Sequence, residues 1–213
     1  MSDLLHKELR LAAHPSLFIF MCMGALVLIP AYPYGVVFFF GCLGLFQSAM
    51  FDRETRDVFY TALLPRPKRD AVKGKLLLAV FAQAGQLILS LPFAFLRTLY
   101  LTDGNPVGIE PNAAYYGFGL MIYGVFNLVF FSQFYKTAYK AGVAFIIALI
   151  PTVLGIAVME AAVHVPGLAW LDGMDGASLA RQLPVLLSGA VIYAAANFLA
   201  YRISAKRFER VDL

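Results

Sequence analysis

Most of this chain consists of long apolar segments. Fifteen of its 17 lysine and arginine residues lie near the N-terminus or in and beside the polar stretches that follow the second, fourth and sixth of these segments. Six such segments occur, near residues 15–33, 34–51, 76–99, 114–134, 141–160 and 183–203. Each approaches the roughly 20 residues that an α-helix needs to cross a bilayer core about 30 Å thick. The pattern therefore predicts an all-α polytopic membrane protein, with one transmembrane domain over residues 1–213.

The distribution of basic residues predicts how the helices are oriented. If successive segments cross the membrane in alternating directions, only Arg97 and Arg181 fall on one side. Cytoplasmic loops of membrane proteins carry the excess of lysine and arginine, so both termini are expected in the cytoplasm. The cytoplasmic side then holds Lys7, Arg10, the seven basic residues from Arg53 to Lys75, Lys136, Lys140 and the basic residues from Arg202 to Arg210.

The composition excludes several classes of protein. Hydrophobic residues make up 61% of the chain and charged residues only 14%, unlike a soluble domain. Six crossings leave too little chain for a soluble enzymatic domain. The net charge of +4 is concentrated in the predicted cytoplasmic loops, where it favours contact with membrane lipid. Nucleic acid is not expected as a partner, because no basic face interleaved with aromatic residues is present.

Residues 3–14 are expected to form a short amphipathic helix. Leu4, Leu5 and Leu9 recur at helical spacing, and charged residues such as Lys7 and Glu8 lie between them. Such a helix lies in the headgroup region of the membrane, here on the cytoplasmic side. A merely solvated tail is the alternative.

The polar segment between the second and third apolar segments has a pattern of its own. It opens with the mixed-charge run 52–57, which predicts a helix start, and residues 57–64 then carry an apolar stripe. Pro65 and Pro67 stop that helix, and Lys68 opens the next one, which runs into the third apolar segment. A loop that only fixed orientation would need charges alone, so the stripe suggests a docking helix. The stripe consists of Val58, Phe59, Ala62 and Leu63.

A few polar side chains lie within the apolar segments. In lipid, such groups face the protein interior or a water-filled path, and they often hydrogen-bond between helices. Both roles, packing of helices and lining of a path, stay open for this set. The set consists of Gln83, Gln86, Asn127, Gln133, Glu160 and Asn197.

No motif of intrinsic catalysis is found. The sequence has no G-x-x-x-x-G-K-[ST] loop to hold phosphates and no H-E-x-x-H pair to hold zinc. The three histidines are far apart in the sequence, and no metal site is predicted. We therefore expect neither enzymatic activity nor a cofactor in this chain.

The segment from Leu63 to Leu77 resembles the cytoplasmic segment between the second and third spans of ABC-2 type transporter permeases. That family places a proline, a basic pair, a valine and a small residue followed by lysine in this order. Here Ala62-Leu63-Leu64 and Pro67 depart from the family pattern. The run 7–10, Lys-Glu-Leu-Arg, is similar to the opening of those permeases. The matching positions are Pro65, Lys68, Arg69, Val72, Gly74 and Lys75.

The resemblance implies a permease subunit of an ABC exporter in the bacterial inner (cytoplasmic) membrane. It implies a second permease copy or paralogue, and a separate ATPase subunit that carries the ATP and magnesium. The size of the chain resembles that of peptide-toxin and antimicrobial-peptide exporters, so the implied cargo is an amphipathic or hydrophobic peptide. The ATPase-coupling residues implied are Val58, Phe59, Ala62, Leu63, Pro65, Lys68 and Arg69.

The family also implies that spans two and five form the inner wall of the transport path. In this chain that wall would be rich in phenylalanine, which suits amphipathic cargo. The alternative is that these side chains face lipid. The candidate lining residues are Phe38, Phe39, Phe40, Phe46, Phe145 and Met159, together with Gln83 and Gln86.

Three other functions are compatible with the pattern. The same architecture could export a lipid or a drug. The chain could also be a membrane scaffold or an immunity protein that transports nothing and needs no ATPase. A proton-coupled carrier that uses Glu160 is disfavoured, because a single carboxylate near the outer edge makes a poor proton relay.

Overall fold

The computed structural model describes residues 2–57, 60, 67–100, 104–138 and 140–211, and all regular structure in them is helical. This confirms the predicted all-α class for the described residues. The elements are α1 (Ser2–Lys7), the π-helical η1 (Glu8–Ala12), α2 (Pro15–Cys22), the 3₁₀-helical η2 (Met23–Leu28), α3 (Val36–Thr55), α5 (Lys68–Tyr100), α6 (Ala113–Phe134), α7 (Ala141–Ala162), the 3₁₀-helical η3 (Pro166–Leu171) and α8 (Gly176–Phe208).

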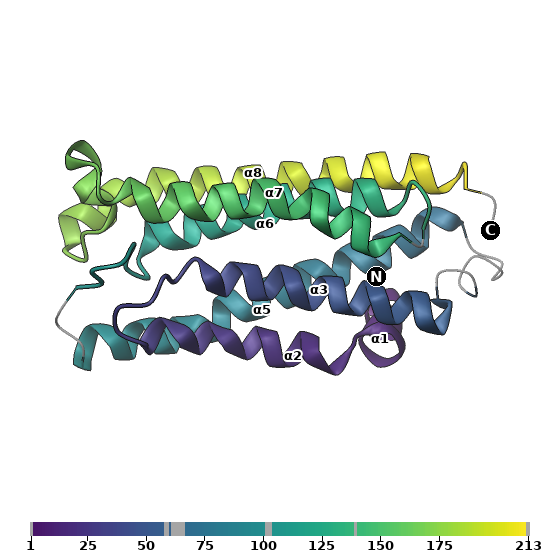
Figure 1. Cartoon of the computed structure of the whole chain (residues 1–213), viewed down its shortest axis with the longest axis horizontal. Helices are drawn as coiled ribbons and strands as arrows, with labels where there is room; N and C mark the ends of the chain where they lie inside the picture. The colour runs from purple at the N-terminus through teal and green to yellow at the C-terminus, as the bar shows by residue number, and fades with distance from the viewer. Residues whose placement is uncertain (1, 58–59, 61–66, 101–103, 139, 212–213) are drawn as a thin grey trace.

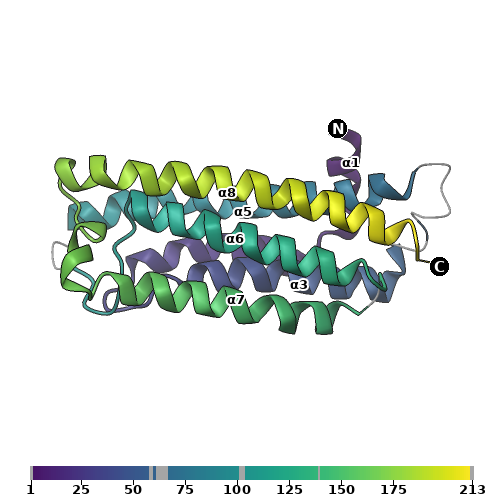
Figure 2. The same ribbon diagram turned by 90° about the horizontal axis from the view of Figure 1, so that it is seen from above.

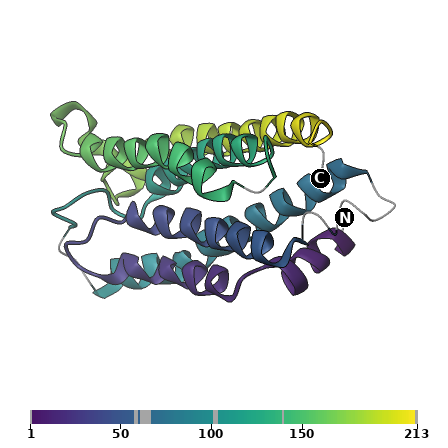
Figure 3. The ribbon, with the colours of Figure 1, turned by 45° about the vertical axis from the view of Figure 1, so that its right-hand side comes forward.

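The long helices run along one axis and form an elongated bundle (Figures 1 and 2). α6 packs against α7 and α8, while α2 packs against α3 and α5. Contacts of α3 with α7 and of α5 with α8 join the two groups. α1, the end of α3, the start of α5 and the end of α8 lie at the same end of the bundle (Figures 1 and 3). We call this the basic end, and the opposite one the far end.

Five described helices, α3, α5, α6, α7 and α8, are long and apolar enough to cross a membrane on their own. The predicted first span, 15–33, is shorter than expected. Its helical part is α2 (8 residues) and η2 (6 residues), which together cover about 24 Å at the usual rises per residue. A sixth crossing is counted only when residues 4–12 and 15–28 are joined across a bend of 98°. The helix ends early because the chain turns at Ala31, whose φ is 52°, between Pro30 and Pro33.

Helix starts follow from side chains that accept hydrogen bonds from free backbone amides. Asn112 Oδ1 accepts from the amide of Tyr115 (3.1 Å) at the start of α6. Asp175 Oδ2 accepts from the amide of Ser178 (3.0 Å), so α8 begins at Gly176 rather than near residue 183.

α5 and α8 are both longer than a membrane crossing requires. Each has 33 residues, or about 50 Å of helix, against a hydrocarbon core of about 30 Å. The prediction that Lys68 opens a helix continuous with the third span is confirmed. These helices therefore extend beyond the membrane core.

Residues 52–55 of the mixed-charge run continue the second span and do not start a new helix, which corrects that part of the sequence-based prediction; helical residues begin again at Asp57, after a break at Arg56. α3 continues through Thr55, and Arg56 ends it with a left-handed φ of 54°. Residues 52–55 stay helical because Asp52 faces the bundle, where it is buried against α5.

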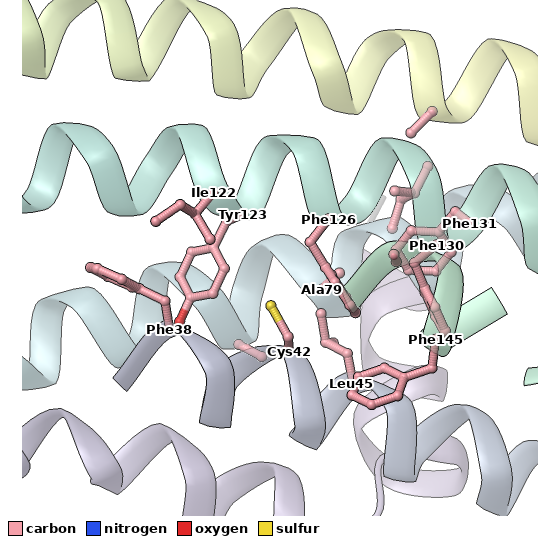
Figure 4. Close-up of a cluster of buried hydrophobic side chains, with 14 of the residues drawn as sticks. Phe38, Cys42, Leu45, Ala79, Ile122, Tyr123, Phe126, Phe130, Phe131 and Phe145 are labelled. Atoms are coloured by element: carbon pink, nitrogen blue, oxygen red, sulfur yellow. The ribbon is translucent and has the colours of Figure 1, made fainter. Parts of the chain in front are cut away.

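The core between α3, α5, α6 and α7 is built largely from aromatic side chains. Figure 4 shows Phe38, Cys42 and Leu45 of α3 directed toward Tyr123 and neighbouring rings of α6. All are buried. This packing fixes the position of α3 against the α6–α8 group.

Candidate functional site

A buried lysine holds three carboxylates together at the basic end. Lys75 Nζ in α5 lies 2.7 Å from Glu8 Oε2, 2.7 Å from Asp52 Oδ1 and 3.0 Å from Asp57 Oδ2. Lys7 adds a second ammonium group, 3.2 Å from Glu8 Oε1 and 3.1 Å from Asp57 Oδ1. We call these five residues the Lys75 cluster.

Burial makes the Lys75 cluster sensitive to the loss of any member. The side chains of Glu8, Asp52 and Lys75 are 1%, 3% and 7% exposed. Removing such charges from water costs several kcal/mol per ion, which only close opposite charges can offset. At Asp57, burial acts to raise the pKa, but the ammonium groups of Lys75 and Lys7 outweigh it and hold the pKa below its usual value. Asp57 therefore stays ionised at neutral pH.

The Lys75 cluster joins the elements from which the polar segment leaves the bundle. Glu8 comes from η1, Asp52 from α3 and Lys75 from α5. Asp57, which directly precedes the predicted docking stripe in the sequence, is paired with Lys7 of α1 and Lys75 of α5. The predicted coupling residues Val58, Phe59, Ala62, Leu63 and Pro65 themselves lie outside the described residues, and their role stays a prediction.

The two remaining predicted coupling residues differ in their surroundings. Lys68 Nζ donates to the backbone oxygen of Val211 (2.8 Å) and lies 5.8 Å from the centre of the Phe208 ring. Lys68 therefore binds the C-terminal segment of its own chain. Arg69 is exposed at the first turn of α5, where a partner could reach it.

A polar network crosses the middle of the bundle. The amides of Gln83 in α5 and Asn127 in α6 exchange hydrogen bonds of 2.9 and 2.8 Å. Asn127 also donates to Asn197 Oδ1 (3.0 Å), and Tyr193 donates to Gln83 Oε1 (2.7 Å), both from α8. The network fastens three helices together inside one chain.

Gln86 fastens a second set of helices. Its Nε2 donates to the backbone oxygens of Phe20 (3.0 Å) and Val37 (2.9 Å), and its Oε1 accepts from the hydroxyl of Tyr123. Gln83 and Gln86 are 1% and 0% exposed. Within the single chain both are helix-packing residues, and a place on the transport path stays a prediction for them.

The predicted aromatic wall is partly interior. Phe46 of α3 stacks on Phe145 of α7 with ring centres 4.3 Å apart, and Phe38 and Met159 are fully buried. Phe39 and Phe40 are partly exposed, and the Phe40 ring stacks on Phe20 of α2 with ring centres 5.6 Å apart.

An arginine–glutamate pair closes the far end. Arg97 donates from Nε and Nη2 to the two carboxylate oxygens of Glu110, at 2.7 and 2.9 Å. The guanidinium also lies 5.1 Å from the centre of the Tyr34 ring. Glu110 Oε1 accepts from the amide of Asn105 (2.5 Å), and the Glu110 amide donates to Asp172 Oδ1 (2.7 Å). Four segments of the chain thus meet at the Arg97–Glu110 pair.

Glu160 belongs to the same end. Its Oε1 accepts from the amide of Gly35 (2.5 Å) and its Oε2 from the amide of Ile109 (3.1 Å). The carboxylate therefore joins α7 to the turn before α3 and to the loop before α6. This bonding gives Glu160 a structural role at the far end.

Sequence reasoning missed the far-end pair. Arg97 was noted only as one of two basic residues on the outer side, and Glu110 was not singled out. The sequence did contain one signal for this pair, Arg97 itself, because a charged residue at the end of a span usually has a partner. Pairing through a loop that folds back over the bundle end could not be read from spacing.

The described side chains do not converge as metal ligands. No group of three or more His, Cys, Asp or Glu residues in the described ranges is placed to hold a metal ion. The carboxylates that do gather are held by Lys7 and Lys75.

The comparison with protein families gives a match over nearly the whole chain. Residues 3–209 match the model described as ABC-2 family transporter protein. No curated protein and no solved structure matches the chain.

Proposed function

Because the chain belongs to the ABC-2 transporter family, we propose that it is the membrane-spanning permease subunit of an ABC exporter. A separate ATPase subunit, which carries ATP and magnesium, would drive it. The observation that supports this is the family match over residues 3–209 of an all-helical bundle with five to six candidate spans. The chain is a transporter membrane component rather than an enzyme.

The proposed orientation places the basic end in the cytoplasm. The helix ends there carry basic residues such as Lys7, Lys68 and Lys206, whereas Arg97 and Arg181 lie toward the far end. Membrane proteins are enriched in lysine and arginine on the cytoplasmic side. We take the membrane to be the bacterial inner membrane. Both termini then lie inside.

The proposed coupling route starts at the docking stripe after Asp57. Phe59 would insert into a cleft of the ATPase, and Arg69 would form an ion pair at the rim. Movement of the stripe would reach Asp57, which Lys75 holds against Asp52 and Glu8. The Lys75 cluster would pass that movement to α3, α5 and the N-terminal helix together.

The proposed path runs between two permease copies, identical or paralogous. α3 has a row of partly exposed side chains, Phe39, Leu43 and Met50, beside the buried core. A wall of this composition favours an amphipathic or hydrophobic peptide over a small polar solute. A lipid or a drug would contact the same wall, and export assays with each class of cargo distinguish these alternatives.

Growth protection tests the proposed function against the immunity alternative. The chain is produced with its partner ATPase in cells exposed to a panel of amphipathic peptides and hydrophobic drugs. An exporter protects only when the ATPase has an intact P-loop, because hydrolysis drives transport. Protection that persists with a P-loop lysine variant of the ATPase would instead support an immunity protein. Phe39→Ala with Phe46→Ala is expected to change which peptides are exported.

A further inference from the structure

An apolar groove lies between α5 and α8 toward the basic end. Its volume is about 240 Å³, below the roughly 300–1,000 Å³ of pockets for drug-sized ligands. The space is too small for a drug-sized ligand, but part of one acyl chain fits it. The groove is lined by Lys73, Leu76, Leu77, Val80, Asn197 and Tyr201.

The groove has a positively charged mouth. Lys73 lines it at the end nearest the start of α5, and Arg69 lies one turn earlier on the same face of that helix. Within the described residues, neither side chain forms an ion pair, although Asp70 is on the intervening turn. Two cations are therefore available beside an apolar channel.

This arrangement matches an anionic phospholipid. Basic pockets between membrane helices on the cytoplasmic side are suited to anionic headgroups, with the acyl chain along the apolar wall. A peptide helix would need a broader apolar face than the three aliphatic side chains of this groove provide. A second copy of this chain would bring its own basic end, and like charges would meet at the mouth.

We propose that the α5–α8 groove binds one anionic phospholipid of the cytoplasmic leaflet. The phosphate lies between Lys73 and Arg69, and one acyl chain lies against Leu76, Leu77 and Val80. Asn197 and Tyr201 provide polar contacts on the α8 side. The site shares Arg69 with the proposed ATPase contact, whereas Lys73 and the groove itself belong to the lipid site alone. Lipid binding is measured on the purified chain without the ATPase, so failure of the lipid site would leave the proposed transport function untouched.

Native mass spectrometry of the purified, delipidated full chain tests the site. Phosphatidylglycerol and phosphatidylcholine with the same acyl chains are added separately, and bound lipid is counted per chain. The wild type should retain phosphatidylglycerol preferentially. Lys73→Ala and Arg69→Ala should each weaken that binding about fivefold, as expected for one basic residue at an anionic surface. Lys206→Ala is the matched control, because Lys206 is exposed at the same end of α8 but does not line the groove.

Val80→Trp provides an independent test, since it fills the groove without changing any charge. It should lower phosphatidylglycerol binding as much as Lys73→Ala does, while Lys73→Arg should retain it. Equal binding of both lipids, or equal effects of Lys73→Ala and Lys206→Ala, would overturn the proposal. If Val80→Trp separates permease copies and leaves lipid binding unchanged, the groove is an interface between copies and the lipid site is wrong.

Discussion

Lys75 is the single residue on which the basic end depends most, since its ammonium group contacts three carboxylates from three parts of the chain. The sequence motif identified the position of this lysine but not its partners. Glu8 and Asp52 are far from it in sequence, and a mixed-charge run near a span end is ordinarily solvated. Only the packing of η1 and α3 against α5 brings them together.

Replacing Lys75 tests this dependence. Lys75→Met keeps an unbranched side chain of similar length but leaves Glu8, Asp52 and Asp57 without their shared partner. Loss of one member of a buried ion pair typically destabilises by about 3–5 kcal/mol. We expect a clear fall in the unfolding temperature of the purified chain, together with loss of export. Thermal unfolding in detergent measures the first effect.

Two further variants make that result specific. Lys136→Met removes an exposed lysine at the same end and should leave the unfolding temperature nearly unchanged. In the double variant Lys75→Met, Asp52→Asn, the losses should be less than additive, because the residues interact directly. Strict additivity, or equal stability of Lys75→Met and Lys136→Met, would show that the Lys75 cluster does not stabilise this end.

Polar residues in the spans were predictable in kind but not in detail. An amide in hydrocarbon must find a partner, so Gln83 and Asn127 could be expected to bond between helices or line a wet path. The structure pairs them with each other. Which helix supplies each partner depends on rotation about the helix axes, and hydropathy does not reveal it.

At the scale of elements, hydropathy located four helices well, predicted one segment too long and predicted one helix too short. α3, α6 and α7 match their predicted segments closely, and α5 matches as one long helix. The first segment was predicted too long, because Ile29 and the apolar residues around Pro30 read as part of a span. The backbone turn at Ala31 is invisible in a hydropathy average. α8 was predicted too short because the cap at Asp175 was not recognised.

The pair formed by α6 and α8 depends on a close approach of two glycines. A Cβ atom on Gly189 would lie 2.9 Å from Gly117 Cα, with backbone rather than a flexible side chain in the way. Gly189→Val should therefore push α6 and α8 apart, at a cost of about 1–3 kcal/mol or more. The measurement is again thermal unfolding of the purified chain.

Gly142→Val is the control for this element. It makes the same chemical change in α7 at a position where no atom lies within 4 Å of the added Cβ. The unfolding temperature of Gly142→Val should stay near that of the wild type. If the two valine variants are equally stable, close approach at Gly189 does not hold α6 to α8.

At the scale of the whole molecule, charge and packing separate the two ends. The basic end carries the Lys75 cluster and both ends of the described chain (Figure 1), while the far end is closed by Arg97, Glu110 and Glu160. The membrane class and the placement of both termini at one end followed from the sequence. The closure at the far end did not, because it is built from loop residues whose partners are set by the fold.

Co-purification from native membranes tests the central claim, that this permease couples to a separate ATPase at its basic end. Tagged wild type is compared with the double variant Phe59→Ala, Arg69→Ala, and Lys136→Ala is the matched control. Lys68→Ala is tested separately, since Lys68 also binds Val211 of its own chain. The account predicts a P-loop ATPase with the wild type and with Lys136→Ala, but not with the double variant. Absence of any P-loop ATPase from the wild type, even with an ATP analogue present, would contradict it.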